Sequence, residues 1–140
     1  MSYWLVKSEP DSWSWDAQVK AGAKGTAWTG VRNHTAKQNL MKMKKGDRAF
    51  FYHSNEGKEI VGVVEVTREH FPDPTDKTAK FVAVDVKAAE PMPTPVTLVA
   101  IKDEPKLADM ALVNQSRLSV QPVTAQEWKL VCAMGGLKGA

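Results

Sequence analysis

The sequence predicts an α+β protein built on one small, curved sheet of mixed or antiparallel strands, with helices around it. Strand-like and helix-like segments follow one another without repetition: a strand, two helices, several strands, helical pieces, a strand and a last helix. A doubly wound parallel sheet would need regular alternation of the two patterns. The chain has 140 residues, the usual size of one domain, so we expect a single domain over residues 1–140.

Composition indicates a soluble globular protein. Apolar residues make up 43% of the chain and charged residues 25%, both near the average for such proteins. No apolar run approaches the ~20 residues of a membrane span. The first residues lack the basic region and apolar stretch of a secretory signal. We therefore expect a cytoplasmic protein with no membrane partner.

The first third of the chain carries signals for one strand and two helices. Residues 3–7 are strand formers, and Pro10 stops their pairing. Ser14 is a good N-cap for a helix over residues 15–21, and residues 24–28 form a short extended piece. Asn33 is a good N-cap for a helix to about residue 44, in which apolar residues recur at i, i+4 and i+7 from Ala36.

The central third reads as β structure. Residues 48–54 and 60–67 flank a turn with Gly57, which predicts a hairpin. Residues 81–87 alternate and form a third strand. The stretch between, residues 70–80, holds two prolines and is expected to be a loop, and three prolines make residues 90–95 a connector.

The last third begins with helical pieces over residues 98–112, which Pro105 interrupts. Residues 118–122 alternate as a strand. Thr124 and Glu127 have the spacing of a capping box, which starts a helix that ends at the glycine pair 135–136. Cys132 lies within this helix, and as the lone cysteine it is expected to be a buried small hydrophobe.

Several kinds of chemistry leave no trace in the sequence. There is no Walker loop, no Gly-x-Gly-x-x-Gly and no Gly-x-Ser-x-Gly. The histidines, His34, His53 and His70, fit no zinc spacing. We therefore expect a protein that is not an enzyme and that holds no cofactor and no metal.

Aromatic residues point to a binding site instead. The chain has five tryptophans, and Trp4, Trp15 and Trp128 have apolar neighbours that are typical of a core. Trp28 differs, because Thr29, Gly30 and a basic, amide-bearing helix start follow it. An aromatic face beside a helix start suits a flat polar ligand such as a base, although a core role for Trp28 remains open.

Two polar clusters and one basic helix complete the candidates. Tyr52, His53 and Ser54 end a predicted strand and are candidate ligand-binding residues. The alternative is that they only form hydrogen bonds with nearby groups of the protein. Arg117 and Ser119 share one face of the last strand. The net charge is +3 with a pI near 9.0, which permits an anionic partner without requiring one. The candidate phosphate contacts are the basic residues in and around the second predicted helix: Arg32, Lys37, Lys42, Lys44 and Lys45. The alternative is that these residues form a solvated helix face.

These residues stand in blocks that resemble the EVE domain family of the PUA-like superfamily. The blocks are residues 3–10 (YWLVKSEP), 28–33 (WTGVRN), 46–47 leading into 51–54 (FYHS), 62–66, and 117–123 (RLSVQPV). Their order along nearly the whole chain makes the resemblance specific. It implies a curved, PUA-like β-barrel with peripheral helices and a pocket at one end. The related YTH domains hold a methylated base in an aromatic cage, and EVE domains are thought to read modified bases, such as modified cytosines, in DNA or RNA.

Transferred to this chain, the resemblance implies a pocket drawn from four segments. Its residues would be Lys7, Ser8, Trp28, Asn33, Tyr52, His53, Ser54, Arg117 and Ser119. The modified base would stack on Trp28, and flanking phosphate would bind Arg117 and the basic helix.

The function we expect is therefore a monomeric, non-enzymatic reader of modified nucleobases in DNA or RNA. Two alternatives stay open at this point. One is an enzyme that acts on a nucleotide or small anion in the same pocket, with His53 as general base. The other is a protein-interaction module.

Overall fold

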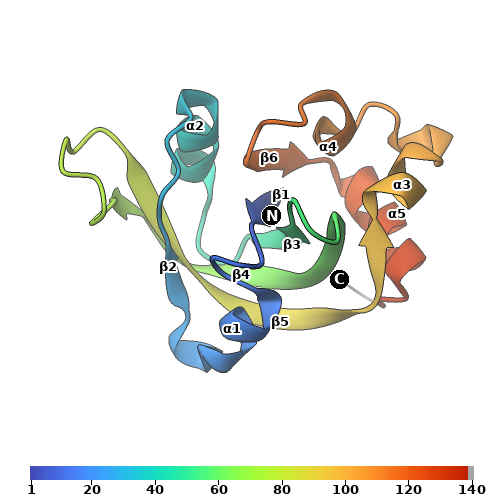
Figure 1. Cartoon of the computed structure of the whole chain (residues 1–140), viewed down its shortest axis with the longest axis horizontal. Coiled ribbons are helices and arrows are strands. Elements are labelled where there is room, and N and C mark those ends of the chain that lie inside the picture. The colour runs from blue at the N-terminus through green and yellow to red at the C-terminus, as the bar shows by residue number, and fades with distance from the viewer. Residues whose placement is uncertain (139–140) are drawn as a thin grey trace.

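The computed structural model describes residues 1–138 as an α+β fold around a six-stranded mixed sheet with the strand order β2-β5-β4-β3-β1-β6 (Figure 1). The strands are β1 (Tyr3–Ser8), β2 (Thr26–Trp28), β3 (Arg48–His53), β4 (Glu59–Pro72), β5 (Val82–Thr97) and β6 (Val120–Val123). The helices are α1 (Trp15–Lys20), α2 (His34–Lys42), α3 (Leu98–Lys102), α4 (Ala111–Asn114) and α5 (Ala125–Gly135). Short 3₁₀ turns cover Gly22–Lys24 and Pro105–Leu107.

One parallel pair sits inside an otherwise antiparallel sheet. Strand β1 runs parallel to β3, with Ser8 opposite His53 at their ends. The pairs β1–β6, β3–β4, β4–β5 and β2–β5 are antiparallel. The predicted mixed sheet, with its central hairpin, is thereby confirmed.

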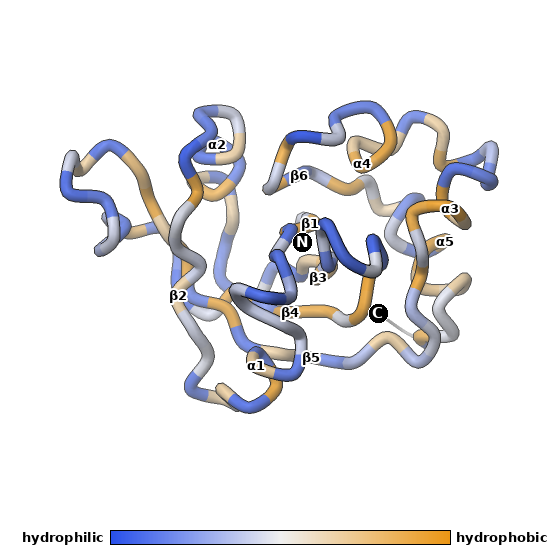
Figure 2. Tube along the Cα trace, viewed as in Figure 1, coloured by the Kyte–Doolittle hydropathy of each residue, from blue (hydrophilic) through white to orange (hydrophobic). Residues whose placement is uncertain are grey.

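The central strands are apolar on both faces because helices cover both. Successive side chains of a strand point to opposite faces, so Phe51 and Phe50 enter two different cores. On one face Phe51 and Val64 pack with α1 and α2. On the other face Phe50 packs with α3–α5, and its ring stacks on Trp128 at a centroid distance of 3.9 Å. Figure 1 shows α3–α5 gathered at one side of the sheet, and Figure 2 shows apolar residues along β4 and these helices.

The sheet is open, and in this respect the predicted β-barrel was wrong. Its outer strands, β2 and β6, do not pair with each other. Helix α2 contacts β5 and β6 and lies between these two ends of the sheet. The Asn39 side chain of α2 donates from Nδ2 to the Val120 carbonyl oxygen at 2.7 Å, in a buried position. A helix side chain thus satisfies an edge carbonyl that strand closure would satisfy in a barrel.

The stretch over residues 90–95 is not a connector, as its prolines predicted, but part of the long strand β5. Gly62 of β4 pairs with Pro91 of β5, and Ile60 pairs with Val96. The strand β5 therefore has more residues than β4 over this stretch, and the extra residues form a bulge. Pro93 and Pro95 lie inside this bulge, where ladder hydrogen bonds are interrupted and a missing N–H is tolerated. Residues 70–72, expected in a loop, likewise extend β4.

The predicted helix caps are confirmed. The side chains of Ser14 and Asn33 accept hydrogen bonds from Ala17 N and Ala36 N, at 3.1 and 2.9 Å. Thr124 and Glu127 form the capping box that starts α5. Cys132 is buried on that helix, and its burial raises the thiol pKa to about 11. Within residues 1–138 no helix has the length and apolarity needed to cross a membrane.

Helix α1 is anchored by Trp15, which packs over Gly62 of β4. The Trp15 ring also meets Phe51 edge to face at 5.4 Å. A Cβ on Gly62 would overlap the Trp15 indole, so the backbone of β4 approaches the ring as closely as only glycine allows. This contact fixes the start of the helix that follows the loop at the end of β1.

We predict that Asn39→Leu destabilises the fold, because it leaves the Val120 carbonyl buried without its donor. The free energy of unfolding should fall by about 1–3 kcal/mol, measured from urea denaturation. The exposed neighbour Gln38 supplies a matched control, since Gln38→Leu removes an amide from the same helix without touching β6. Equal midpoints for the two variants would show that α2 does not seal this edge of the sheet.

Candidate functional site

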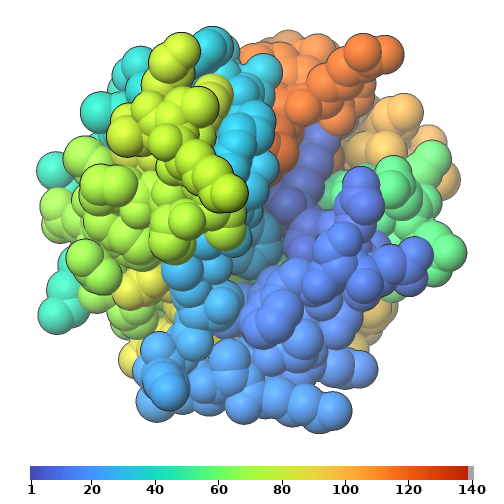
Figure 3. Space-filling model, turned by 60° about the vertical axis from the view of Figure 1, so that its left-hand side comes forward, coloured from blue at the N-terminus to red at the C-terminus, as the bar shows by residue number. Residues whose placement is uncertain are grey.

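A cavity of about 450 Å³ opens where β1 ends, on the sheet face that α1 and α2 cover. Figure 3 shows the hollow between the segment leading into α2, the turn before β6 and the loop after β1. Its lining comes from these three segments, the end of β1 and β2: Lys7, Ser8, Glu9, Ser12, Trp13, Thr26, Ala27, Trp28, Thr29, Gly30, Val31, Arg32 and Ser119.

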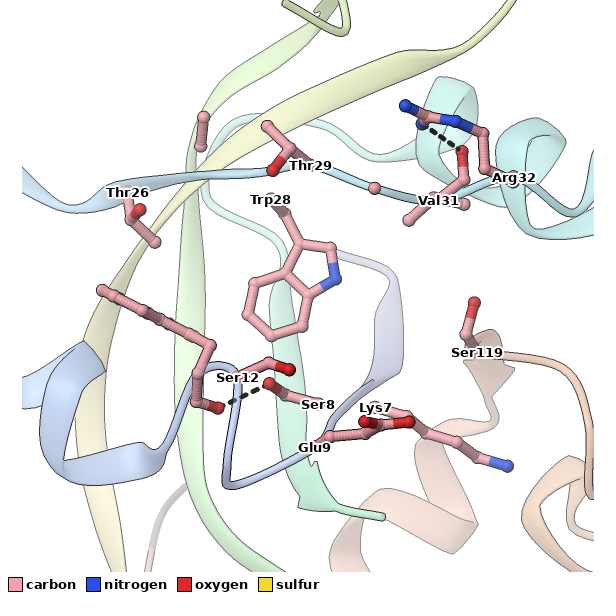
Figure 4. Close-up of a pocket in the computed structure, with 13 residues that line it drawn as sticks. Lys7, Ser8, Glu9, Ser12, Thr26, Trp28, Thr29, Val31, Arg32 and Ser119 are labelled. Atoms are coloured by element: carbon pink, nitrogen blue, oxygen red, sulfur yellow. Dashed lines mark hydrogen bonds between the residues drawn. The ribbon is translucent and has the colours of Figure 1, made fainter. Parts of the chain in front are cut away.

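Trp28 forms an aromatic wall of the cavity (Figure 4). Its ring meets Phe51 edge to face at 5.5 Å, and only 7% of the residue is exposed. Figure 4 shows the indole nitrogen turned toward the space between Val31 and Ser119. No described side chain or backbone group bonds this nitrogen, and since an indole N–H is a donor only, it is free for a ligand acceptor.

Trp13 adds a second aromatic side chain to the lining. Its Nε1 donates to Gln18 Oε1 at 2.8 Å, and Gln18 is fully buried in α1. Its carbonyl oxygen accepts from the Ser8 hydroxyl. Because both ends of Trp13 are bonded, its half-buried ring is held at the cavity by α1 and by the end of β1.

Asp73 fastens the wall formed by residues 30–32. It lies in the loop between β4 and β5, and its side chain is 0% exposed. Its Oδ2 accepts from Gly30 N at 2.8 Å and from the Arg32 guanidinium at 3.1 Å, while Oδ1 accepts from Thr75 N and Thr75 Oγ1, both at 2.7 Å. A single buried carboxylate therefore joins two loops that are about forty residues apart in sequence.

The charge states of the site follow from these contacts. Burial alone would raise the pKa of Asp73, but the hydrogen bonds from Thr75, Gly30 and Arg32 outweigh it and hold the pKa below the ordinary 3.8. Burial lowers the pKa of Lys7, whose ammonium donates to the Ser116 carbonyl oxygen at 2.6 Å. The Lys7 ammonium also lies 5.8 Å from the Tyr52 ring centroid and is directed away from Trp28 in Figure 4, so Arg32 is the cation that the lining contributes.

Five of the residues predicted from the sequence line this cavity. They are Lys7, Ser8, Trp28 and Ser119 of the predicted base pocket, and Arg32 of the predicted phosphate contacts. Ser119 lies just before β6, not within a strand as expected, and its backbone oxygen accepts from Lys7 N at 2.9 Å. Arg117 is exposed in the turn before it and lies outside the lining.

The strand end at residues 52–54 does not face the cavity as a unit. Tyr52 is 4% exposed and belongs to the core on the opposite face of the sheet, where burial raises its pKa. His53 Nε2 accepts from Trp15 N at 3.0 Å, and burial lowers the imidazole pKa. Ser54 N donates to the Ser8 carbonyl oxygen. The twofold alternation of strand side chains explains why these three neighbours separate.

The remaining predicted residues lie on or near α2. Asn33 is outside the lining, and its side-chain oxygen is occupied as the N-cap. Lys37 follows in the first turns of the helix. Lys42, Lys44 and Lys45 lie at its far end, where Lys44 pairs with Glu69 at 3.8 Å. The predicted basic helix therefore splits into a part beside Arg32 and a part at the other end of α2.

Trp13 is the main residue that sequence reasoning missed. It sits between Ser12 and Ser14, two residues before the core Trp15. Trp13 packs against the same core as Trp15 but stays half-buried, and no local pattern separates the roles of these two tryptophans. Asp73 was missed because a loop aspartate between prolines is usually solvated.

The lining suits a flat ligand with polar edges. It offers two indoles, a free indole N–H, hydroxyl groups, one carboxylate (Glu9) and the guanidinium of Arg32. Across residues 1–138 there is no group of three histidine, cysteine, aspartate or glutamate side chains arranged to hold a metal ion.

Comparison with known proteins places this geometry in a family. The EVE domain pattern matches residues 2–134. A bacterial protein, Rpa0253 from Rhodopseudomonas palustris, has an NMR structure that is 68% identical in sequence, with a TM-score of 0.94 over 100% of this chain and 97% of its own.

Human thymocyte nuclear protein 1 is a more distant relative. It is 31% identical over 95% of this chain and 73% of its own length. The crystal structure of human THYN1 in complex with 5-methylcytosine-containing DNA has a TM-score of 0.89 and covers 96% of this chain and 98% of its own. A YTH domain from Zygosaccharomyces rouxii, 18% identical, shares the fold with a TM-score of 0.60 over 99% of this chain and 87% of its own.

We predict that Asp73→Asn loosens the cavity wall and lowers the free energy of unfolding at pH 7 by about 1–3 kcal/mol. Since the folded pKa of Asp73 lies below its unfolded value of 3.8, the stabilisation is present above pH ~4 and is lost as the pH falls through the folded pKa. The difference between wild type and variant should therefore shrink below pH ~4 in urea denaturation. A difference that stays constant with pH would contradict the role of the carboxylate charge.

Proposed function

The chain belongs to the EVE domain family, and from this membership and the cavity we propose that it is a non-enzymatic reader of a modified base in nucleic acid. The observation that carries the proposal is the cavity itself, with two tryptophans and a free indole N–H. The human relative's complex with 5-methylcytosine-containing DNA makes DNA with a modified cytosine the first candidate ligand.

Stacking supplies the sequence-tolerant part of the affinity. The base enters the cavity and lies against Trp28, with Trp13 as a further aromatic contact. Aromatic stacking contributes about 1–3 kcal/mol per base. Extruding a base from a duplex costs a few kcal/mol, so a single cavity binds weakly unless phosphate contacts add to it.

Polar groups of the lining distinguish one base from another by hydrogen bonds to the polar edge of the base. The free N–H of Trp28 donates to a ring nitrogen or carbonyl of the base, and Ser119 lies on the side toward which this N–H points. Glu9 supplies an acceptor for an exocyclic amino group, such as that of cytosine. Val31 offers apolar contact to a methyl substituent.

The non-enzymatic character is part of the proposal. The lining includes no histidine and no cysteine, the side chains that most often act as base or nucleophile. His53, the candidate general base of the enzyme alternative, lies outside the lining and has its Nε2 engaged by Trp15 N. These features favour binding over turnover.

We predict selective binding of oligonucleotides that carry the modified base. Tryptophan fluorescence should be quenched by a single-stranded oligonucleotide with one 5-methylcytosine more strongly than by the same oligonucleotide with cytosine. Trp13→Ala and Trp28→Ala should each weaken the binding by about fivefold to a hundredfold, since loss of a stack costs about 1–3 kcal/mol and 1.4 kcal/mol is tenfold.

Trp13→Ala is the decisive variant of the two. Trp28 packs on Phe51 in the core, so Trp28→Ala can weaken binding by disturbing the fold, whereas Trp13 is half-buried. A circular dichroism spectrum like that of the wild type verifies the fold of each variant. Equal quenching by modified and unmodified oligonucleotides, unchanged in folded Trp13→Ala, would reject the base reader and favour a protein-interaction module.

A further inference from the structure

A cluster of cations surrounds Phe81 next to the cavity. Phe81 is half-buried and lies immediately before β5. The Arg32 guanidinium lies 5.4 Å from its ring centroid and the Lys37 ammonium 5.9 Å, while the His34 ring lies at 5.3 Å. Arg32 also lines the cavity, so the cluster adjoins the site where the base would bind.

The loop over residues 73–81 holds Phe81 in place. The Phe81 carbonyl oxygen accepts from Asp73 N at 3.0 Å, and Phe81 N donates to Asp76 Oδ2 at 2.8 Å. The same Asp73 bonds Gly30 and Arg32. The ring and the cavity wall are therefore parts of one hydrogen-bonded unit, and the cations that lie on the ring keep a fixed relation to the cavity.

Cation–π contact at this distance favours one position of the Lys37 side chain, while Arg32 is held by the ring and by its bond to Asp73. Arg32 is paired with Asp73, but Lys37 has no ion pair among the described residues. The cluster thus presents one uncompensated positive charge, on a lysine that shares the Phe81 ring with the lining residue Arg32. Pre-organisation of a charged side chain reduces the entropy lost when it binds an anion.

The opposite end of α2 lacks these features. Lys42 is exposed on the last turn and has no aromatic partner within residues 1–138, and Lys44 pairs with Glu69. None of the lysines there lines the cavity. A flipped or single-stranded base is joined to its own phosphates by one sugar, so those phosphates must lie at the rim, not at the far end of the helix.

We propose that the phosphodiester next to the bound base lies on the Arg32, His34 and Lys37 cluster around Phe81, and that Lys42, Lys44 and Lys45 do not contact it. This inference rests on the proposed function and specifies where the nucleic-acid backbone crosses the rim. It is narrower than the expectation from the sequence, in which the whole basic helix binds phosphate. Figure 3 shows the segment leading into α2 beside the β4–β5 loop at the edge of the hollow.

Two variants of the same helix test the proposal. Lys37→Gln and Lys42→Gln each remove one charge from α2, so the net charge changes equally. The ligand is a fluorescently labelled single-stranded oligonucleotide with one 5-methylcytosine, and its Kd is measured by anisotropy between about 50 and about 200 mM salt.

Lys37→Gln should weaken binding severalfold and reduce the slope of log Kd against log salt concentration by about 0.7, the value for one phosphate contact of a single strand. Lys42→Gln should leave both quantities near wild type. Phe81→Leu, which removes the ring but no charge, should weaken binding in the same direction as Lys37→Gln, provided its thermal unfolding midpoint verifies the fold.

The possible failures are separable. Equal effects of Lys37→Gln and Lys42→Gln on binding that still prefers 5-methylcytosine would overturn the phosphate site alone. No preference for 5-methylcytosine, together with a slope that changes only in Lys37→Gln, would retain the phosphate site and reject the base reader. An oligonucleotide that does not bind at all would reject both.

Discussion

The alternation of side chains along β3 is the constraint on which the rest of the structure depends. Phe50 and Phe51 are neighbours in sequence and point to opposite faces of the sheet. Phe50 stacks on Trp128 of α5, whereas Phe51 meets Trp15 and Trp28 edge to face. Both phenylalanines are fully buried, so one dipeptide in the middle of the sheet joins the two cores.

The same alternation decides where a binding site can form. The face that Phe51 enters carries the aromatic wall, because Trp28 is held there by its contact with Phe51. Tyr52 follows Phe50 to the other core, and His53 serves the start of α1. The cavity is therefore built from loops and strand ends around the Phe51 face, while the conspicuous polar run at the end of β3 holds elements together.

Two long-range polar contacts convert this packing into a defined cavity. Asn39 joins α2 to the outer strand β6, which leaves the sheet open with a helix between its ends. Asp73 joins the β4–β5 loop to the backbone and side chain of residues 30–32. The Asn39 bond is buried, and so is the Asp73 carboxylate, so leaving either group unpaired would be costly. The wall of the cavity and the cation cluster around Phe81 are consequently positioned together.

The sequence by itself determined the class of the fold and most local structure: the strands of the central hairpin and the caps at Ser14, Asn33 and Thr124. These features depend on contacts between residues near in sequence, which periodicity and capping reveal. Only the tertiary structure decided that the sheet stays open, that prolines 93 and 95 lie in a bulge of β5, and that Trp13 and not the end of β3 lines the cavity. Those outcomes depend on partners far apart in the chain, such as Asn39 with Val120 and Asp73 with Gly30, and no local pattern specifies which distant group will satisfy a buried donor or acceptor.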